Sequence, residues 1–146
     1  MPRVMIAAPG SGSGKTMITC GLLELLRRAG RPISFKCGPD YIDPMFHRFV
    51  LNIPSRNLDT FFTAPDRTRS LMGKACMKEG ADLAVIEGVM GYYDGLGGVS
   101  VRGSSYELSV QTGTPVILVV NGRGMSLSIA ALIRGFMDMY PDQMIR

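Results

Sequence analysis

The chain alternates short apolar runs with longer segments in which apolar residues recur at helical spacing. Four short runs are predicted strands, and the last two are apolar throughout, which is typical of strands buried on both faces. The predicted strands span residues 4–8, 33–37, 83–86 and 115–120. Four further segments have the spacing of helices. The predicted helices span residues 17–29, 44–50, 66–79 and 125–139.

Alternating strands and helices are typical of βαβ units, so we expect an α/β fold, doubly wound, with a mostly parallel sheet flanked by helices. Only four strands are predicted, and residues 142–146 follow the last helix without offering a closing strand. We therefore expect residues 1–146 to form one incomplete domain of a longer protein. Such a domain is expected to fold poorly and to be inactive alone.

The composition is ordinary for a folded protein, with 46% apolar and 19% charged residues. The net charge of +4 suits anionic ligands, but the basic residues are scattered and do not favour binding of nucleic acid. Three cysteines without CxxC spacing predict neither disulfides nor a zinc site, and favour a cytoplasmic location. No apolar run approaches about 18 residues, so we expect no contact with a membrane.

A glycine-rich stretch follows the first predicted strand and opens the first helix. It reads Pro9-Gly-Ser-Gly-Ser-Gly-Lys-Thr16 and ends like a P-loop, although Pro9 replaces the usual first glycine. Glycines let backbone N–H groups curl around phosphate oxygens, and the helix start favours anions. The strand-to-helix context favours a phosphate-binding loop over a plain turn, and thus predicts bound ATP. The predicted ATP contacts are Ser11, Gly12, Ser13, Gly14, Lys15 and Thr16.

Three carboxylates follow predicted strands, where open parallel sheets bind their ligands. Asp40 and Asp43 come after the second strand, and Glu87 ends the third. Carboxylates beside a triphosphate require a cation, so Asp40 and Glu87 are predicted to bind Mg²⁺ together with the Thr16 hydroxyl. An alternative for Asp40 and Asp43 is that they shape a turn and the start of a helix. A glutamate that closes a buried strand without a partner is costly, so a functional role is favoured for Glu87.

Other polar and aromatic residues near these strand ends are candidates for substrate contact. Lys36 lies at the end of the second strand and could hold a phosphoryl group or a substrate carboxylate. The tyrosines of the loops, including Tyr93, could face a large flat substrate. The predicted substrate contacts are Tyr41, Ile42, Tyr92 and Asp94. The only histidine, His47, lies among apolar residues and is expected to be packed rather than catalytic.

The chain resembles the family of cobyrinic acid a,c-diamide synthases, which are amidotransferases of cobalamin biosynthesis. The resemblance runs from Val4 to about Phe136, and the phosphate loop matches the family's form, proline included. Its most specific motif is KCGPDYIDP at residues 36–44. EGVMGYYDG at residues 87–95 and the sequence Asn-Leu-Asp at 57–59 follow in the expected order.

The resemblance implies a dethiobiotin-synthetase-like P-loop NTPase fold, with residues 1–146 as the N-terminal part of an ATP-binding synthetase domain. ATP would phosphorylate a side-chain carboxylate of a corrin macrocycle, and ammonia would displace the phosphate. A C-terminal glutaminase domain, outside this chain, would supply the ammonia. The oligomeric state stays open, with a homodimer as one alternative. The predicted catalytic residues are Lys15, Lys36, Asp40, Asp43 and Glu87.

Three alternatives to this family remain. Nickel-sirohydrochlorin a,c-diamide synthase shares the motifs, and sequence barely separates the two. Dethiobiotin synthetase itself lacks a segment like that at residues 36–44. A partner-regulated switch ATPase of the same fold has a second lysine early in the phosphate loop, where this chain has Gly10.

Overall fold

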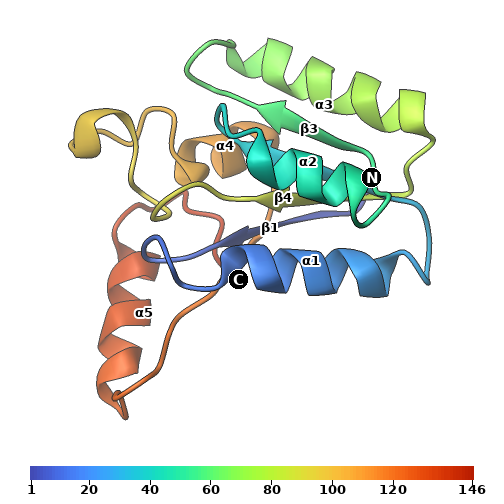
Figure 1. Cartoon of the computed structure of the whole chain (residues 1–146). Helices are drawn as coiled ribbons and strands as arrows, with labels where there is room; N and C mark the ends of the chain where they lie inside the picture. The colour runs from blue at the N-terminus through green and yellow to red at the C-terminus, as the bar shows by residue number, and fades with distance from the viewer.

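A computed structural model describes all 146 residues of the chain. Figure 1 shows one central sheet with helices packed on it. All strand pairs are parallel, and the five strands lie in the order β3-β2-β4-β1-β5. The expected α/β fold with a parallel sheet is confirmed. The strands are β1 Arg3–Ala7, β2 Pro32–Cys37, β3 Ser55–Leu58, β4 Leu83–Glu87 and β5 Val116–Leu118.

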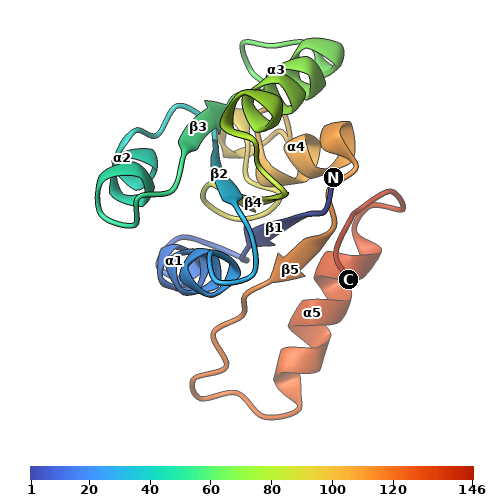
Figure 2. The same ribbon diagram turned by 90° about the vertical axis from the view of Figure 1, so that its right-hand side faces the viewer.

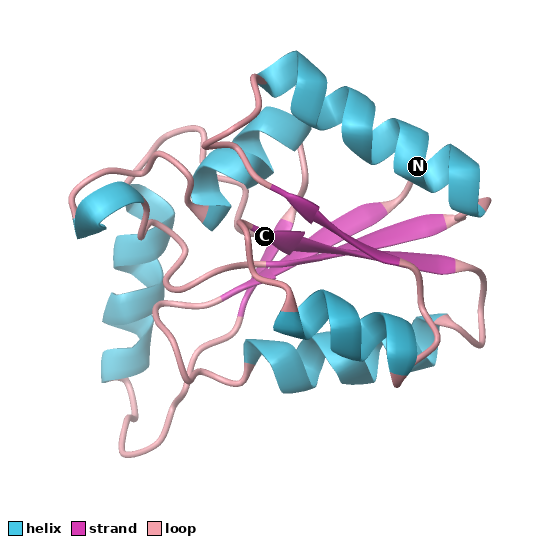
Figure 3. Ribbon diagram, turned by 45° about the horizontal axis from the view of Figure 1, so that its top comes forward, coloured by secondary structure: helices cyan, strands magenta, loops and turns pink.

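Helices cover both faces of the sheet. Figure 2 shows α1 and α2 on one side and α3, α4 and α5 on the other, and Figure 3 shows the strands between these layers. A short 3-10 turn, η1, lies in the long loop after β4. No helix is both long enough and apolar enough to cross a membrane. The helical elements are α1 Lys15–Leu26, α2 Ile42–Phe49, α3 Pro65–Glu79, η1 Leu96–Gly98, α4 Ser105–Thr112 and α5 Ser128–Asp138.

The pleat of the strands gives the two faces of the sheet different chemistry. Successive side chains of a strand point to opposite faces. Along β2, Ile33, Phe35 and Cys37 join the large core under α3 and α4, while Ser34 and Lys36 do not. That large core has 17 buried apolar residues, whereas a second cluster beside α1 has four: Ile6, Leu23, Ile53 and Val85.

Besides the short turn η1, the strand β3 and the helix α4 are absent from the sequence prediction. The strand β3 is short and has two exposed positions, Arg56 and Asn57, because it lies at the edge of the sheet and pairs only with β2. Its polar sequence therefore lacks the apolar run of a buried strand. The helix α4 begins at a Ser104 cap that accepts from the backbone N–H of Glu107, and its short sequence shows little helical periodicity.

Several predicted ends differ from those of the structure. The helix α5 begins at Ser128 rather than at residue 125, and β5 ends at Leu118 rather than at residue 120. The helix α1 stops at Leu26 rather than at residue 29, and Arg27 is its C-cap. Residues 142–146 add no further strand, and Ile145 forms only an isolated parallel bridge with Val116 of β5. The backbone N–H of Val116 donates to the carbonyl of Met144, which extends the sheet by one short contact.

Candidate functional site

The loops that follow the strands gather at one end of the sheet. Figure 1 shows this end at the left, where β1 leads into α1 and the long loop after β4 begins. Parallel strands bring their carboxyl ends to the same edge, which is where open α/β sheets bind ligands. The three loops that meet here follow β1, β2 and β4.

The glycine-rich loop between β1 and α1 has a backbone that glycine makes possible. Gly12 has φ 73° and Gly14 has φ 88°, both in the left-handed region. Ser13 Oγ donates to the Gly10 carbonyl at 2.9 Å and closes the loop. Side-chain atoms added at these glycines would meet nothing within 4 Å, so the space beside the loop is open. The open space and the start of α1 together form a place suited to an anion.

Lys15, the first residue of α1, is a buried cation without a carboxylate partner. Its Nζ donates to the carbonyls of Gly10 at 3.0 Å and Met90 at 2.6 Å. Met90 itself has φ 45°, an uncommon backbone conformation for a residue other than glycine. Burial, followed by the nearby charge of Lys36, lowers the pKa of Lys15. An anion in the adjacent space would therefore stabilise this ammonium group.

Glu87 is the centre of a network of buried polar groups. It is fully buried at the end of β4, and its Oε1 accepts from Thr16 Oγ1 at 2.6 Å and from Lys36 Nζ at 3.2 Å. Lys36 Nζ also donates to Asp43 Oδ2 at 2.6 Å. Lys36 and Glu87 are register partners on β2 and β4, which explains why they meet. The structure thus brings together four predicted site residues from four elements.

The charges in this network set the pKa of each group. Burial alone would lower the pKa of Lys36, but its bonds to Asp43 and the charge of Glu87 outweigh burial and raise it. Burial raises the pKa of Asp43, but the hydrogen bond and charge of Lys36, together with Glu87 and His47, outweigh burial and lower it. Burial raises the pKa of Glu87, because the hydrogen bonds from Thr16 and Lys36 offset only part of its effect. Lys36 is thus neutralised by carboxylates before any ligand binds.

His47 is packed, as the sequence predicts, and its ring also borders this network. It is fully buried on α2, with Nδ1 2.8 Å from Ser34 Oγ and Nε2 3.5 Å from Glu87 Oε2. Neither His47 Nε2 nor Glu87 Oε2 has a hydrogen-bond partner. Burial lowers the pKa of His47, which favours the neutral ring. A proton on Nε2 would face the carboxylate and leave Nδ1 to accept from Ser34.

Asp40 is the predicted metal ligand that lies at the border of the network. Its Oδ1 accepts from the backbone N–H of Ile42 at 2.9 Å, and its Oδ2 lies 3.9 Å from Lys36 Nζ. The turn-shaping alternative therefore describes Asp40, whereas Asp43 makes no helix cap and pairs with Lys36. No group of three or more His, Cys, Asp or Glu side chains is arranged to hold a metal ion. The site predicted from sequence uses only two carboxylates with Thr16 and phosphate oxygens, so shared binding of one ion by Asp40 and Glu87 stays a prediction.

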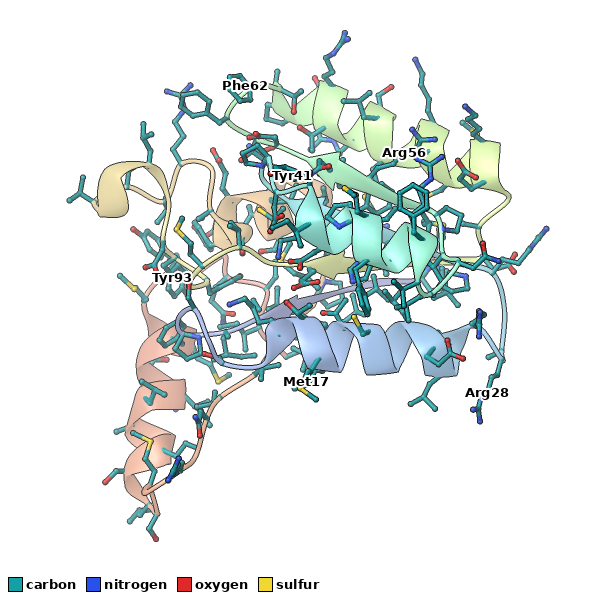
Figure 4. The ribbon with its side chains drawn as sticks, in the orientation of Figure 1. Met17, Arg28, Tyr41, Arg56, Phe62 and Tyr93 are labelled. Carbon is teal, nitrogen blue, oxygen red and sulfur yellow. The ribbon has the colours of Figure 1, made fainter.

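The predicted substrate contacts fall into two groups. Tyr41 and Ile42 are about 70% exposed at the start of α2, and Figure 4 shows Tyr41 at the end of the molecule where the loops gather. Asp94 is exposed, but its Oδ2 accepts from the backbone N–H of Gly91 and shapes the loop. The expectation that Tyr92 and Tyr93 face a substrate is wrong for this structure. Both are buried in the large core, because their rings pack with those of Tyr106, Phe136 and Tyr140.

Asn57 supports the loop after β2, although the sequence indicated this residue only as part of the Asn-Leu-Asp motif. Its Nδ2 donates to the carbonyls of Gly38, at 2.8 Å, and of Asp40. It therefore fastens the loop after β2 to the edge strand β3. The edge strand β3 thus holds the loop that carries Asp40 and Tyr41 in place.

Known proteins include relatives of this chain, although no family model matches it. A cobyrinate a,c-diamide synthase of Priestia megaterium is 43% identical over 141 residues, which are 96% of this chain and 30% of that protein. A protein of the same name from Thermoplasma acidophilum is 42% identical over all of this chain and 32% of its own length. A hydrogenobyrinate a,c-diamide synthase of Mycobacterium tuberculosis is 46% identical over 91% of this chain and 30% of its own length. The chain thus spans about a third of these relatives.

Proposed function

Over the segment that it spans, this chain belongs to the family of cobyrinate and hydrogenobyrinate a,c-diamide synthases, and we propose that it forms the ATP-binding part of such an enzyme. The reaction proposed is the ATP-dependent amidation of the a and c side-chain carboxylates of a corrin such as cobyrinate. Each carboxylate is activated as an acyl phosphate. Ammonia, supplied by a glutaminase domain of the full-length protein, then replaces the phosphate.

The observation that carries this proposal is the pairing of Lys15 with two backbone carbonyls beside an open glycine loop. A lysine held only by neutral carbonyls can exchange them for phosphate oxygens, which bind an ammonium group more strongly. The backbone N–H groups from Gly12 to Lys15 and the start of α1 supply further donors. We therefore assign the β- and γ-phosphates of ATP to this loop.

The residues beside the loop fit Mg²⁺. Thr16 Oγ1 and the Glu87 carboxylate are hard oxygen ligands within hydrogen-bond distance of each other, and Glu87 Oε2 is buried without a partner. A protein usually gives Mg²⁺ only one or two carboxylates, and phosphate and water supply the remaining oxygens. Thr16 and Glu87 would hold the ion. When bound, it would supply positive charge to the phosphate oxygens.

The first chemical step needs no protein base. An oxygen of the ionised substrate carboxylate bonds to the γ-phosphorus, and the bond from that phosphorus to the bridging oxygen of ADP breaks. The γ-phosphoryl group carries negative charge through this transfer, and Lys15 stabilises it. In the second step the ammonia nitrogen bonds to the acyl carbon and inorganic phosphate leaves. The nitrogen loses a proton to give the amide.

Lys36 acts through the carboxylates around it. Its Nζ contacts Asp43, Glu87 and the carbonyl of Gly88, so its charge is already balanced. It therefore holds Glu87 and Asp43 close together despite their like charges. Lys15, which has no such partner, is the cation available to phosphate.

The test measures ADP formation by the full-length protein that carries this chain, with Mg²⁺-ATP and ammonium, with and without cobyrinate or hydrogenobyrinate. We expect the macrocycle to stimulate ADP formation. Lys15→Ala and Glu87→Gln should each lower the stimulated rate by about 10²- to 10³-fold. Lys74→Ala, which removes an exposed lysine of α3, is the matched control and should behave like the wild type.

Two outcomes would contradict parts of this proposal. ADP formation that ignores every tetrapyrrole but responds to a protein or DNA partner would replace the amide-synthetase function with that of a switch ATPase. Stimulation by a tetrapyrrole with no loss in Lys15→Ala would leave the family standing and remove the assigned phosphate site.

A further inference from the structure

A pocket of about 400 Å³ lies at the same end of the sheet as the candidate site. One wall is the turn after β3, with Phe61 and Phe62, and the other is the loop after β4, with Leu96 and Arg102. Figure 4 places Phe62 at this end of the molecule, on the turn that precedes α3. No sequence motif assigned a role to these four side chains.

The two walls are fastened to each other. Glu107 Oε2 accepts from Thr60 Oγ1 and from the backbone N–H of Gly103, both at 2.6 Å. The turn is closed by Asp59 Oδ1, which accepts from the backbone N–H of Phe61 at 2.9 Å. The opposite loop is closed by the bond from the Leu96 N–H to the Arg102 carbonyl at 2.9 Å. The pocket is therefore formed before a ligand arrives, which lowers the entropic cost of binding.

The surface of the pocket combines apolar rings with a free cation. Phe61, Phe62 and Leu96 are all exposed, and exposed apolar groups that gather in one place usually mark a binding site. The Arg102 guanidinium lies 5.2 Å from the centre of the Phe61 ring and takes part in none of the nine ion pairs. The pocket therefore suits a ligand that is apolar on its face and anionic at its edge.

The pocket adjoins the phosphate site through a shared residue. Met90 lines the pocket, and its carbonyl accepts from Lys15 Nζ at 2.6 Å. Gly38, two residues beyond Lys36, lines the pocket as well. A ligand in the pocket would thus meet Arg102 on one side and, on the other, Met90, the residue whose carbonyl holds Lys15.

A second cavity, of about 610 Å³, lies at the opposite end of the sheet and lacks these properties. Its Arg31 pairs with Asp82, and its Arg69 pairs with Asp66. Its Arg3 donates to the carbonyls of Met1 and Gly113. Arg31 and Arg69 are thus neutralised by carboxylates, and this cavity does not adjoin the phosphate loop.

We propose that the pocket of Phe61, Phe62, Leu96 and Arg102 binds the apolar face of the tetrapyrrole polycarboxylate, and that Arg102 holds a carboxylate other than the one being activated. This inference rests on the proposed function and adds substrate contacts to it. The rings of Phe61 and Phe62 cover the macrocycle, while Arg102 fixes its rotation. Rotation decides which side chain lies beside Lys15, so the pocket selects the carboxylate that is amidated.

The experiment measures binding of cobyrinate to the full-length protein by equilibrium dialysis, with Phe62→Ala and Arg102→Gln variants. We expect Phe62→Ala to weaken binding by about 3- to 10-fold and Arg102→Gln by about 10-fold. Phe49→Ala is a matched control, since Phe49 is 74% exposed and Phe62 is 76% exposed. Arg67→Gln is the control for charge, because Arg67 is exposed on α3 outside the pocket.

Further measurements distinguish failure of the pocket from failure of the proposed function. Arg102→Lys should restore part of the affinity, and the methyl ester of the macrocycle should bind wild type and Arg102→Gln equally. Binding of an ATP analogue should be unchanged in every variant. Wild-type affinity for cobyrinate in both pocket variants would overturn the pocket while the proposed function stands. Failure of the wild type to bind any tetrapyrrole or to release ADP would overturn the proposed function and the pocket with it.

Discussion

The two faces of the sheet are built from the same strands and differ in what they bury. The apolar face, under α3 and α4, buries a continuous core that includes Phe35 and the ring cluster around Tyr93. The charged face, under α1 and α2, buries Ser34, Lys36, His47 and Glu87. Neighbours in sequence, such as Phe35 and Lys36, therefore contribute to different properties of the molecule.

The comparison indicates how the fold can hold ionised groups away from water. Burial of a charged pair costs several kcal/mol per ion, and the attraction within the pair often returns less than this cost. The apolar face contributes stability through burial of apolar surface, at about 25 cal/mol per Å². We infer that the apolar face offsets the cost of the charged face. Stability and catalysis should then respond to different substitutions along one strand.

The largest effect should come from Lys36→Met, which removes the cation of the charged face. We expect ADP formation stimulated by cobyrinate to fall by about 10²- to 10³-fold, because Glu87 and Asp43 lose the group that holds them together. The loss should persist in protein that circular dichroism shows to be folded, since Asp43 is partly exposed and can be solvated. A Lys36→Met variant with wild-type turnover would show that the network does not support catalysis.

The next effect tests the apolar face at the adjacent residue. Phe35→Ala should lower the free energy of unfolding by about 3–5 kcal/mol, because it leaves a cavity in a fully buried core. The folded fraction should bind an ATP analogue like the wild type. Urea unfolding and dialysis measure the two quantities separately. Loss of nucleotide affinity in folded Phe35→Ala would show that the faces are not independent.

The sequence predicts the central strands and the glycine loop well, for a physical reason. Apolar runs and glycine spacing are local patterns, so β1, β4 and the loop before Lys15 follow from them. The edge strand β3 lacks such a run, and α4 lacks a clear period. The burial of Tyr92 and the place of Asp40 depend on contacts between distant segments, which a single sequence does not reveal. The partner of His47 is of this kind, because Ser34, His47 and Glu87 come from three different elements.

A smaller effect should show whether His47 supports Glu87 at the proposed metal site or only fills space in the core. His47→Asn keeps an amide near Nδ1 and loses the donor that faces Glu87, whereas His47→Gln can place an amide N–H near Nε2. We expect His47→Asn to weaken the affinity for Mg²⁺ in the ATP complex by about 10- to 100-fold, and His47→Gln to restore most of it. Mn²⁺ bound in place of Mg²⁺ can be counted by electron paramagnetic resonance. Equal losses in both variants, with equal destabilisation, would show that His47 only fills space.

The smallest effect should be the dependence of stability on pH, measured without Mg²⁺ or nucleotide. Because the pKa of Glu87 is raised on folding, the unfolded chain loses this proton first as the pH rises. Stability from Glu87 is therefore complete below its unfolded pKa and is lost as the pH rises toward the folded pKa. The contribution of Asp43 to stability changes with pH in the opposite direction. Because the pKa of Asp43 is lowered on folding, this contribution is lost only as the pH falls.

Two isosteric variants separate these opposed contributions. Glu87→Gln should abolish the loss of stability that occurs as the pH rises above the unfolded pKa of Glu87. Asp43→Asn should abolish the loss that occurs as the pH falls toward the folded pKa of Asp43. Urea unfolding between pH 3 and 7 would be compared with that of Asp66→Asn, a control on the exposed start of α3. A wild-type curve that Glu87→Gln leaves unchanged would mean that Glu87 is ionised equally in both states. The charged face would then hold its carboxylate without the cost of burial on which the contrast between the faces depends.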